Sequence, residues 1–217
     1  MNIIKALLLT CVMPLSILSA QKTTKFTVKI SGYTEGATVK LLGVVFDQNF
    51  LADTAKLTSD GSATFVNENG FKEGLYYLLT PEKNNFQFFI ASGENDFTLK
   101  TSKDNLVLGM TAVGSLENQL LFDNLRYQVA LEEKYNALSR QLNGIQPNTP
   151  QYAEMTKQRQ GLLDDRDAKL ADLKQQYPNS LFVKFKIAGQ NPKIRMSYYP
   201  NGTLDSLTTM RNYRMDW

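Results

Sequence analysis

Apolar and polar residues alternate along the first half of the chain, in short runs separated by Gly, Asn and Asp. Phe26, Val28 and Ile30 alternate with polar neighbours, which is typical of a β-strand with one buried and one solvent-facing side. The same period predicts strands at 25–30, 39–45, 54–58, 62–66, 74–80, 86–90 and 97–101. Short strands at roughly ten-residue spacing predict an antiparallel β-sandwich or a partly open barrel over residues 21–113.

The strongest turn signal in this half is Asp60-Gly61. An Asp-Gly pair between two alternating runs is typical of a two-residue β-hairpin. We therefore expect the strands at 54–58 and 62–66 to pair with each other.

Residues 114–190 change to the period of an α-helix. Ser115 is a good N-cap, because its hydroxyl can accept a hydrogen bond from the first helical turn. One apolar stripe then follows, made of Leu131, Tyr135, Leu138 and Leu142. Asn143-Gly144 is typical of residues that end a helix.

A second helix is predicted to begin at Thr149-Pro150, which combines a capping hydroxyl with a proline in the first turn, and to end before Pro178. Two helices of about 27 residues joined by a short loop predict an antiparallel helical hairpin roughly 40 Å long. A third, short helix is predicted at 180–188. We expect an α+β fold in which the β part comes first.

Residues 191–217 form a tail rich in tyrosine and proline, with a turn at 200–202 and a last helix predicted from Leu204. Its aromatic and basic side chains are Tyr198, Tyr199, Tyr213, Trp217, Lys193, Arg195, Arg211 and Arg214. Aromatic residues mixed with arginine are typical of a surface that docks a partner. We interpret the tail as the start of a linker or of a truncated further domain.

Residues 1–20 have the pattern of a cleaved signal peptide. Lys5 precedes an apolar run at 6–18, and Ser19-Ala20 supply small residues for cleavage. The apolar run is shorter than the about 20 residues that span a bilayer. We therefore expect export to the periplasm or cell envelope. The alternative is a lipoprotein, because residues 8–11 faintly resemble a lipobox, and only a lipidated Cys11 would attach the protein to a membrane.

Composition narrows the chemistry further. The sequence contains no histidine, and its single cysteine, Cys11, lies in the predicted leader. The exported chain would then hold neither a thiol nor an imidazole, which excludes disulfide bonds and catalysis that depends on Cys or His. An apolar content of 42% can build a packed core, whereas a net charge of +3 is too small to indicate a nucleic-acid partner.

The densest group of titratable side chains lies in the predicted second helix. It comprises Asp164, Asp165, Asp167 and Asp172, interleaved with Arg166 and Lys169. Asp165 does not share a helix face with Asp164 and Asp167, and Lys169 lies four residues beyond Asp165. We interpret the group as a solvated, salt-bridged helix face rather than a metal site.

Acidic residues in the predicted β-connections, at 47, 53 and 94–96, lack the spacing of a dedicated calcium loop and are interpreted as turn residues. The sequence contains no glycine-rich phosphate loop. We therefore assign no catalytic, cofactor-binding or metal-binding residue, predict no cofactor, and expect the chain not to be an enzyme.

Aromatic residues are dense at Tyr76-Tyr77 and at 86–89. Because Phe86, Phe88 and Ile90 alternate, we interpret that strand as core rather than as a ligand groove. The alternative hypothesis is that the β domain binds a small ligand or a glycan, which requires exposed aromatic side chains. The candidates for such a surface are Phe46, Phe50, Tyr76, Tyr77 and Phe89.

Several short motifs resemble the β-rich module that precedes the redox domain in envelope thioredoxin-like proteins of the TlpA/ResA type. The matching segments are Asp53-Thr54, Asp60 to Phe65, Gly74-Leu75-Tyr76, Gly114 to Asn118, Tyr177 to Phe182 and Tyr213 to Trp217. They follow the strand progression, the start and exit of the helical segment, and the beginning of the linker in that family. The resemblance spans nearly the whole chain after the leader.

This resemblance implies a non-catalytic envelope module that positions or recruits a thioredoxin-like domain, either in the same chain or as a separate partner. Members with a complete redox domain carry a Cys-x-x-Cys motif, which this sequence lacks. No catalytic residue is therefore carried over. The residues expected to form a ligand or partner surface are Tyr76, Tyr77, Tyr198, Tyr199, Arg211, Tyr213 and Trp217.

Overall fold

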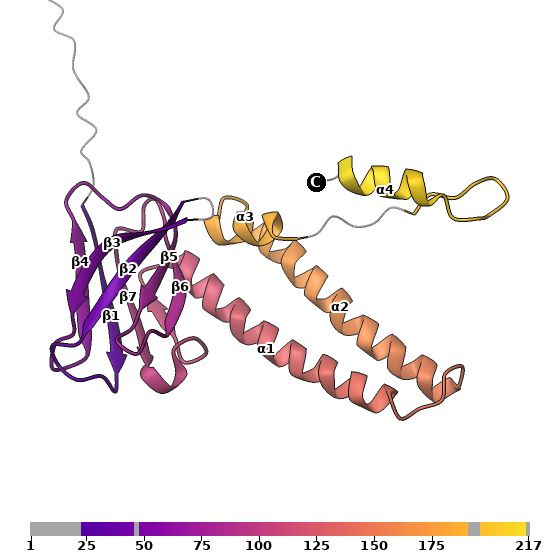
Figure 1. Cartoon of the computed structure of the whole chain (residues 1–217), viewed down its shortest axis with the longest axis horizontal. Helices are drawn as coiled ribbons and strands as arrows, with labels where there is room; N and C mark the ends of the chain where they lie inside the picture. Colours follow the sequence, from indigo (N-terminus) through magenta and orange to yellow (C-terminus); the bar gives the residue numbers. More distant parts are fainter. Residues whose placement is uncertain (1–22, 46–47, 191–195, 216–217) are drawn as a thin grey trace, which may run out of the picture.

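The computed structural model describes residues 23–45, 48–190 and 196–215 (Figure 1). Two mostly antiparallel four-stranded sheets come first and four α-helices follow, which confirms the predicted α+β class. The predicted leader at 1–20, with Cys11, and Phe46, Lys193, Arg195 and Trp217 lie outside the described residues.

Eight strands form the two sheets. They are β1 (Thr24–Ser31), β2 (Thr38–Val45), β3 (Gln48–Lys56), β4 (Ser62–Asn67), β5 (Gly74–Leu79), β6 (Asn85–Ile90), β7 (Asp96–Ser102) and β8 (Thr111–Val113). One sheet has the order β4-β1-β7-β8 and the other β3-β2-β5-β6. The expectation of a wholly antiparallel domain is wrong at one pair, because β1 and β7 run parallel. Strand direction depends on which distant strands become neighbours, and the alternation of residues carries no such information.

The predicted hairpin at Asp60-Gly61 is also wrong. β3 pairs with β2, whereas β4 pairs with β1 in the other sheet, so the turn carries the chain from one sheet to the other. The turn itself is as tight as the Asp-Gly pair predicts, since the Gly61 amide donates to the Thr58 carbonyl at 2.9 Å. Gly61 has φ +78°, and a Cβ there would lie 2.5 Å from the Ile30 carbonyl oxygen. The same local turn chemistry therefore serves a crossing between sheets.

The two sheets face each other across an aromatic core. The ring centroid of Phe26 in β1 lies 5.0 Å from those of Phe65 and Phe97 in its own sheet, and 5.4 Å from that of Phe88 in the other. Phe26, Phe65 and Phe88 are completely buried. Phe86 is buried as well, which confirms that the aromatic run in β6 is core. Within the described residues the two sheets do not close into a barrel.

The helices are α1 (Leu116–Leu142), α2 (Pro150–Gln176), α3 (Leu181–Ala188) and α4 (Ser206–Met215). The first two begin at the predicted caps, where the Ser115 and Thr149 hydroxyl oxygens each accept from a backbone amide in the first turn. The last helix begins at Ser206, two residues after the predicted start. Among the described helices, none is long and apolar enough to cross a membrane.

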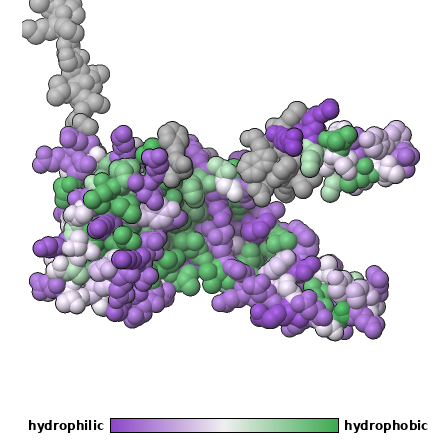
Figure 2. Space-filling model, viewed as in Figure 1, coloured by the Kyte–Doolittle hydropathy of each residue, from purple (hydrophilic) through white to green (hydrophobic). Residues whose placement is uncertain are grey.

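Helix α1 leads away from the sheets, and α2 runs back toward them and is followed by α3 (Figure 1). Two cation–π contacts link α1 and α2: Lys169 Nζ lies 4.3 Å from the centroid of the Tyr127 ring, and the Arg159 guanidinium 5.6 Å from that of Tyr135. No residue of α2 is fully buried. Figure 2 shows apolar surface gathered where the sheets meet the helices, whereas the far end of α1 and α2 is mostly hydrophilic.

Candidate functional site

A buried carboxylate connects the start of α1 to the start of α3. Glu117 is only 8% exposed. Its carboxylate oxygens accept hydrogen bonds from the Ser180 hydroxyl at 2.6 Å and from the Leu181 and Phe182 amides at 3.0 and 2.8 Å. A negative charge at the N-terminus of a helix is stabilised by free amide donors and by the helix dipole. Glu117 therefore fixes the position of α3 against α1.

The start of α1 is in turn bonded to the sheets. The Asn118 side-chain oxygen accepts from the Phe89 backbone amide at 2.7 Å, and its nitrogen donates to the Phe89 carbonyl at 2.8 Å. Asn118 therefore satisfies both backbone groups of Phe89 in β6, as a residue of a neighbouring strand would. Glu94, in the turn between β6 and β7, accepts from the Ser115 hydroxyl and from the Glu117 amide. We call Glu94, Ser115, Glu117, Asn118 and Ser180 the helix–sheet joint.

The helix–sheet joint brings together two motifs that are far apart in the sequence. Ser115, Glu117 and Asn118 belong to the segment Gly114 to Asn118, and Ser180 to the segment Tyr177 to Phe182. Each polar side chain in the joint has a hydrogen-bond partner in the structure. Because the joint is buried and its polar groups are satisfied, these residues hold elements together rather than offer groups to a ligand.

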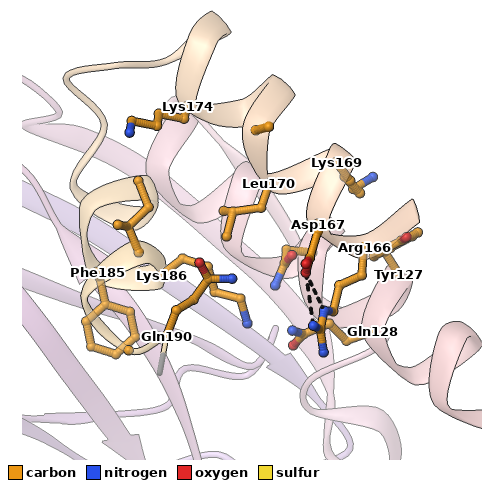
Figure 3. A pocket seen from close by; sticks show the side chains of 14 residues that line it. Tyr127, Gln128, Arg166, Asp167, Lys169, Leu170, Lys174, Phe185, Lys186 and Gln190 are labelled. Atoms are coloured by element: carbon orange, nitrogen blue, oxygen red, sulfur yellow. Dashed lines mark hydrogen bonds and ion pairs between the residues drawn. The ribbon is translucent and has the colours of Figure 1, made fainter. Parts of the chain in front are cut away.

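Next to the joint lies a hollow of about 770 Å³ between α1, α2 and α3, which we call the helical groove (Figure 3). Its charged lining residues are Arg166, Asp167, Lys169, Lys174 and Lys186. Figure 3 shows Lys186 from α3, Gln190 just beyond the end of α3 and Arg166 from α2 extending toward the same space. Four cationic side chains thus share the groove with one carboxylate.

The cations differ in how they are compensated. Arg166 donates from Nε and Nη2 to one Asp167 oxygen, at 3.2 and 2.9 Å. The Arg166–Asp167 ion pair agrees with the predicted salt-bridged helix face, whereas Lys169 lies over the Tyr127 ring instead of pairing with Asp165. Lys186 makes no hydrogen bond or ion pair with any described residue. Burial lowers the pKa of Lys186, and the positive charge of Arg166 lowers it further.

Amide side chains complete the lining of the helical groove. Asn124 from α1 is 8% exposed, and Gln128 and Gln190 lie at the rim. No serine, threonine or cysteine is among the described residues that line it. Elsewhere in the described chain, no group of three or more His, Cys, Asp or Glu side chains is placed to hold a metal ion. The lining offers hydrogen-bond donors and positive charge, which suit the binding of an anionic group.

The aromatic residues predicted for a binding surface of the sheet differ in exposure. Tyr76 is 4% exposed, its hydroxyl donates to the Lys72 carbonyl at 2.8 Å, and burial raises its pKa. Tyr76 and Phe89 are therefore core residues and not part of an exposed surface: Tyr76 packs near Phe88 between the sheets, and Phe89, 1% exposed, packs against Phe182 and Phe185 of α3. Tyr77 is half-buried and accepts from the Gln87 amide group at 2.8 Å. Phe50 is 42% exposed.

The predicted surface residues of the tail lie apart from the sheet residues (Figure 1). Tyr198 and Tyr199 are 64% and 48% exposed, and Arg211 is exposed on α4. Leu207 and Met210 on the same helix are exposed as well. We call these five residues the C-terminal surface. Tyr213 lies in α4, but its side chain, like Trp217, is outside what the structure describes.

Sequence reasoning missed the helical groove. Asn124, Arg166 and Lys186 come from three different helices and become neighbours only in the folded chain. One signal was available: Asn124 follows Leu121 by three residues, so a polar amide occupies a position on the apolar side of α1. A buried polar side chain needs a partner, and that requirement marks the position as a candidate for binding.

The sequence matches no protein-family model and no curated protein. Among solved structures, the chain is similar to (S)-allantoin synthase at 12% identity, over 43% of this chain and 44% of that chain, with a TM-score of 0.31. It is also similar to a DUF3823 family protein from Parabacteroides merdae ATCC 43184 at 12% identity, over 37% and 43% of the two chains, with a TM-score of 0.25. The match spans less than half the length of each of these proteins.

Proposed function

We propose that this chain is a non-catalytic module of the cell envelope that positions or recruits a thioredoxin-like domain or partner. In this proposal a β-sandwich supports a helical hairpin, and the C-terminal surface meets the partner. The observation that carries the proposal is the helix–sheet joint, in which the Glu117 carboxylate accepts three hydrogen bonds from Ser180, Leu181 and Phe182.

The joint supports a positioning role because it restrains the helices in several directions. Asn118 bonds both backbone groups of Phe89, and Glu94 bonds the first turn of α1. Hydrogen bonds to a charged group contribute more than neutral ones, about 1.5–3 kcal/mol each. A module that only needed to be folded would not require a buried carboxylate between helices, since apolar packing can serve the same purpose.

The C-terminal surface supports recruitment. Tyr198, Tyr199, Leu207 and Met210 are all exposed, with Arg211 beside them on α4. Tyrosine, methionine and arginine are enriched where proteins bind one another. The whole sequence contains no Cys-x-x-Cys motif, so any thiol–disulfide exchange would be carried out by the partner.

Photo-crosslinking in the native host tests this proposal. A photoreactive phenylalanine derivative replaces Tyr198 in the full chain, and crosslinked peptides are mapped by mass spectrometry. We expect crosslinks to a domain that contains Cys-x-x-Cys, on a second protein or further along a longer parent. The same probe at Val66 in β4, which is 53% exposed, is the matched control and should not crosslink to that domain.

Crosslinks from Tyr198 only to proteins without such a motif, or equal crosslinking from Val66, would contradict recruitment. Insulin reduction by the purified chain provides an independent measurement. We expect no rate above that of the buffer, and a measurable rate would show that the chain itself is a redox catalyst.

A second candidate function is a small-ligand or glycan-binding β domain. It is supported by a hollow of about 480 Å³ beside Phe50, Leu51 and Phe71 at the edge of the β3-β2-β5-β6 sheet. However, the Phe50 ring lies directly over Gly43, where an added Cβ would be 2.3 Å from the ring, so the ring also covers bare backbone. Loss of glycan binding in Phe50→Ala, with Val66→Ala unaffected, would favour this candidate over the first.

A further inference from the structure

The helical groove contains a cation that no described residue compensates. Lys186 lines the groove from α3, is partly buried, and has no ion-pair or hydrogen-bond partner among the described residues. The charged residues that line the groove with it are Arg166, Asp167, Lys169 and Lys174 on α2, and Arg166 is the one whose positive charge acts on Lys186. Three of these four α2 side chains are cationic. A half-buried lysine beside a further cation loses free energy, because neither water nor a carboxylate fully solvates its charge.

A second observation in the same place is independent of the charges. Asn124 is more than nine-tenths buried, its side chain lines the groove, and it makes no hydrogen bond with a described residue. Buried amide side chains in native proteins are hydrogen-bonded in the large majority of cases. The Asn124 amide is not among the fully buried polar groups of the described residues, so it reaches the open space of the groove and is available there to a bound group.

We propose that the helical groove binds a small molecule through an oxyanion, a carboxylate or a phosphate, held between Lys186 and Arg166 with Asn124 as a further donor. This proposal goes beyond the positioning role and does not depend on it. The groove volume, about 770 Å³, lies within the range of about 300–1,000 Å³ that is typical of small-molecule sites.

The chemistry of the donors selects this class of ligand. Ammonium, guanidinium and amide groups all donate hydrogen bonds, and charge-assisted bonds to oxyanions are the strongest that they form. A neutral ligand would leave the charge of Lys186 uncompensated. Leu170, Ala171 and Phe185 also line the groove, so the rest of the ligand can be apolar. Carboxylates and phosphates both present acceptor oxygens, so the donors of the groove suit either group. Separate titrations with phosphate and with citrate distinguish them.

Nuclear magnetic resonance on the ¹⁵N-labelled full chain tests the site without any substitution. Sodium phosphate or trisodium citrate is added at constant ionic strength maintained with sodium chloride. We expect the side-chain amide signals of Asn124 and Gln190 to shift in a saturable way. The signals of Gln151, which is exposed and lies outside the groove at the start of α2, should not shift.

Substitutions then identify the donors. We expect Lys186→Gln and Arg166→Gln each to weaken binding at least about tenfold, because each removes one charge-assisted partner. Lys184→Gln is the matched control: Lys184 lies on the same helix, is exposed and does not line the groove. Asn124→Asp should abolish binding, because its carboxylate would itself occupy the cations, and the melting temperature should not fall.

Saturable shifts with phosphate alone, with citrate alone or with both would support the site and name the ligand group. Absence of saturable shifts at Asn124 with either anion would overturn the proposal. Equal weakening by Lys184→Gln and Lys186→Gln would also overturn it, since the effect would then reflect overall charge. Because the wild-type titration needs no variant, the proposal stays testable even if Lys186→Gln does not fold.

Discussion

The two sheets and the pair of helices α1 and α2 are stabilised in different ways. In the sheets, Phe26 is completely buried and its ring contacts Phe65, Phe88 and Phe97. In α2 no residue is fully buried, and in α1 the buried residues lie in the first turns, apart from Leu142 at the end. The sheets carry their own core, whereas the helices depend on what holds them at their base.

The two regions differ in whether their side chains are available to bind a ligand. A side chain in the core between the sheets is committed to packing, as Tyr76 and Phe88 are. The helices, by contrast, retain two groups that have no hydrogen-bond partner among the described residues, Lys186 and Asn124, where they line the helical groove. Stability is not uniform across a protein, and functional regions are drawn from the less stable parts. The helix–sheet joint holds α1 and α3 against the sheets, and the helical groove lies next to it.

The largest expected effect is in the sheet core. Phe26→Ala should lower the free energy of unfolding by about 3–5 kcal/mol, because it removes a buried ring and leaves a cavity between the sheets. Urea denaturation followed by circular dichroism measures this change. Leu163→Ala in the half-buried face of α2 is the comparison, and we expect a loss of about 1 kcal/mol. Equal losses at the two positions would break the distinction between the regions.

An intermediate effect is expected at the joint. Glu117→Ala leaves the Ser180 hydroxyl and the Leu181 and Phe182 amides without their acceptor, at a cost of about 3 kcal/mol. Hydrogen exchange should become faster at Leu181 and Phe182 while the β1 amides stay protected. Glu133→Ala, at an exposed position of α1, is the control and should change neither. Faster exchange throughout both sheets would mean that the two regions unfold as one unit.

The smallest expected change in stability is at the turn around Asp60, where the chain passes from one sheet to the other. The Asp60 carboxylate accepts from Thr58 Oγ1 at 2.6 Å, from Lys29 Nζ at 2.9 Å and from Ser62 Oγ at 3.0 Å. These bonds, that of Thr58 above all, hold the pKa of Asp60 well below its ordinary value. Because the folded-state pKa is depressed, the stabilisation is present above about pH 4 and is lost as the pH falls further.

Asp60→Asn should therefore lower the midpoint of urea unfolding slightly at neutral pH, and the difference from the wild type should shrink below about pH 4. Denaturation curves at several pH values measure the difference. Asp104→Asn is the control, because Asp104 is exposed and makes no hydrogen bond with a described residue. A difference that grows as the pH falls would contradict the assigned sign.

Local features of the fold could be predicted because they depend on neighbouring residues. The hydroxyls of Ser115 and Thr149 cap the two long helices as expected, and Pro150 occupies the first turn of α2. The alternation of Phe26, Val28 and Ile30 predicts β1 and its buried face. Each of these signals acts within one or two turns of the chain, so its outcome does not require knowledge of the partner element.

Pairings between distant elements could not be predicted. Asp60-Gly61 has the chemistry of a hairpin turn, yet the strands on its two sides join different sheets. Lys169 has an aspartate four residues earlier, yet it lies over Tyr127 of another helix. In both cases a local preference of a few tenths of a kcal/mol is outweighed by tertiary packing. Periodicity indicates which side of a strand or helix is buried, but not what lies against it.

The sequence by itself determined the α+β order of the elements, the helix starts, the aromatic strands and the lack of histidine, because these are properties of single residues and of near neighbours. Only the tertiary structure decided which strands pair, that Glu117 meets Ser180, and that Asn124, Arg166 and Lys186 line one groove. The physical reason is that burial and Coulomb interaction depend on distance in space, and residues 63 positions apart become neighbours only when the chain has folded.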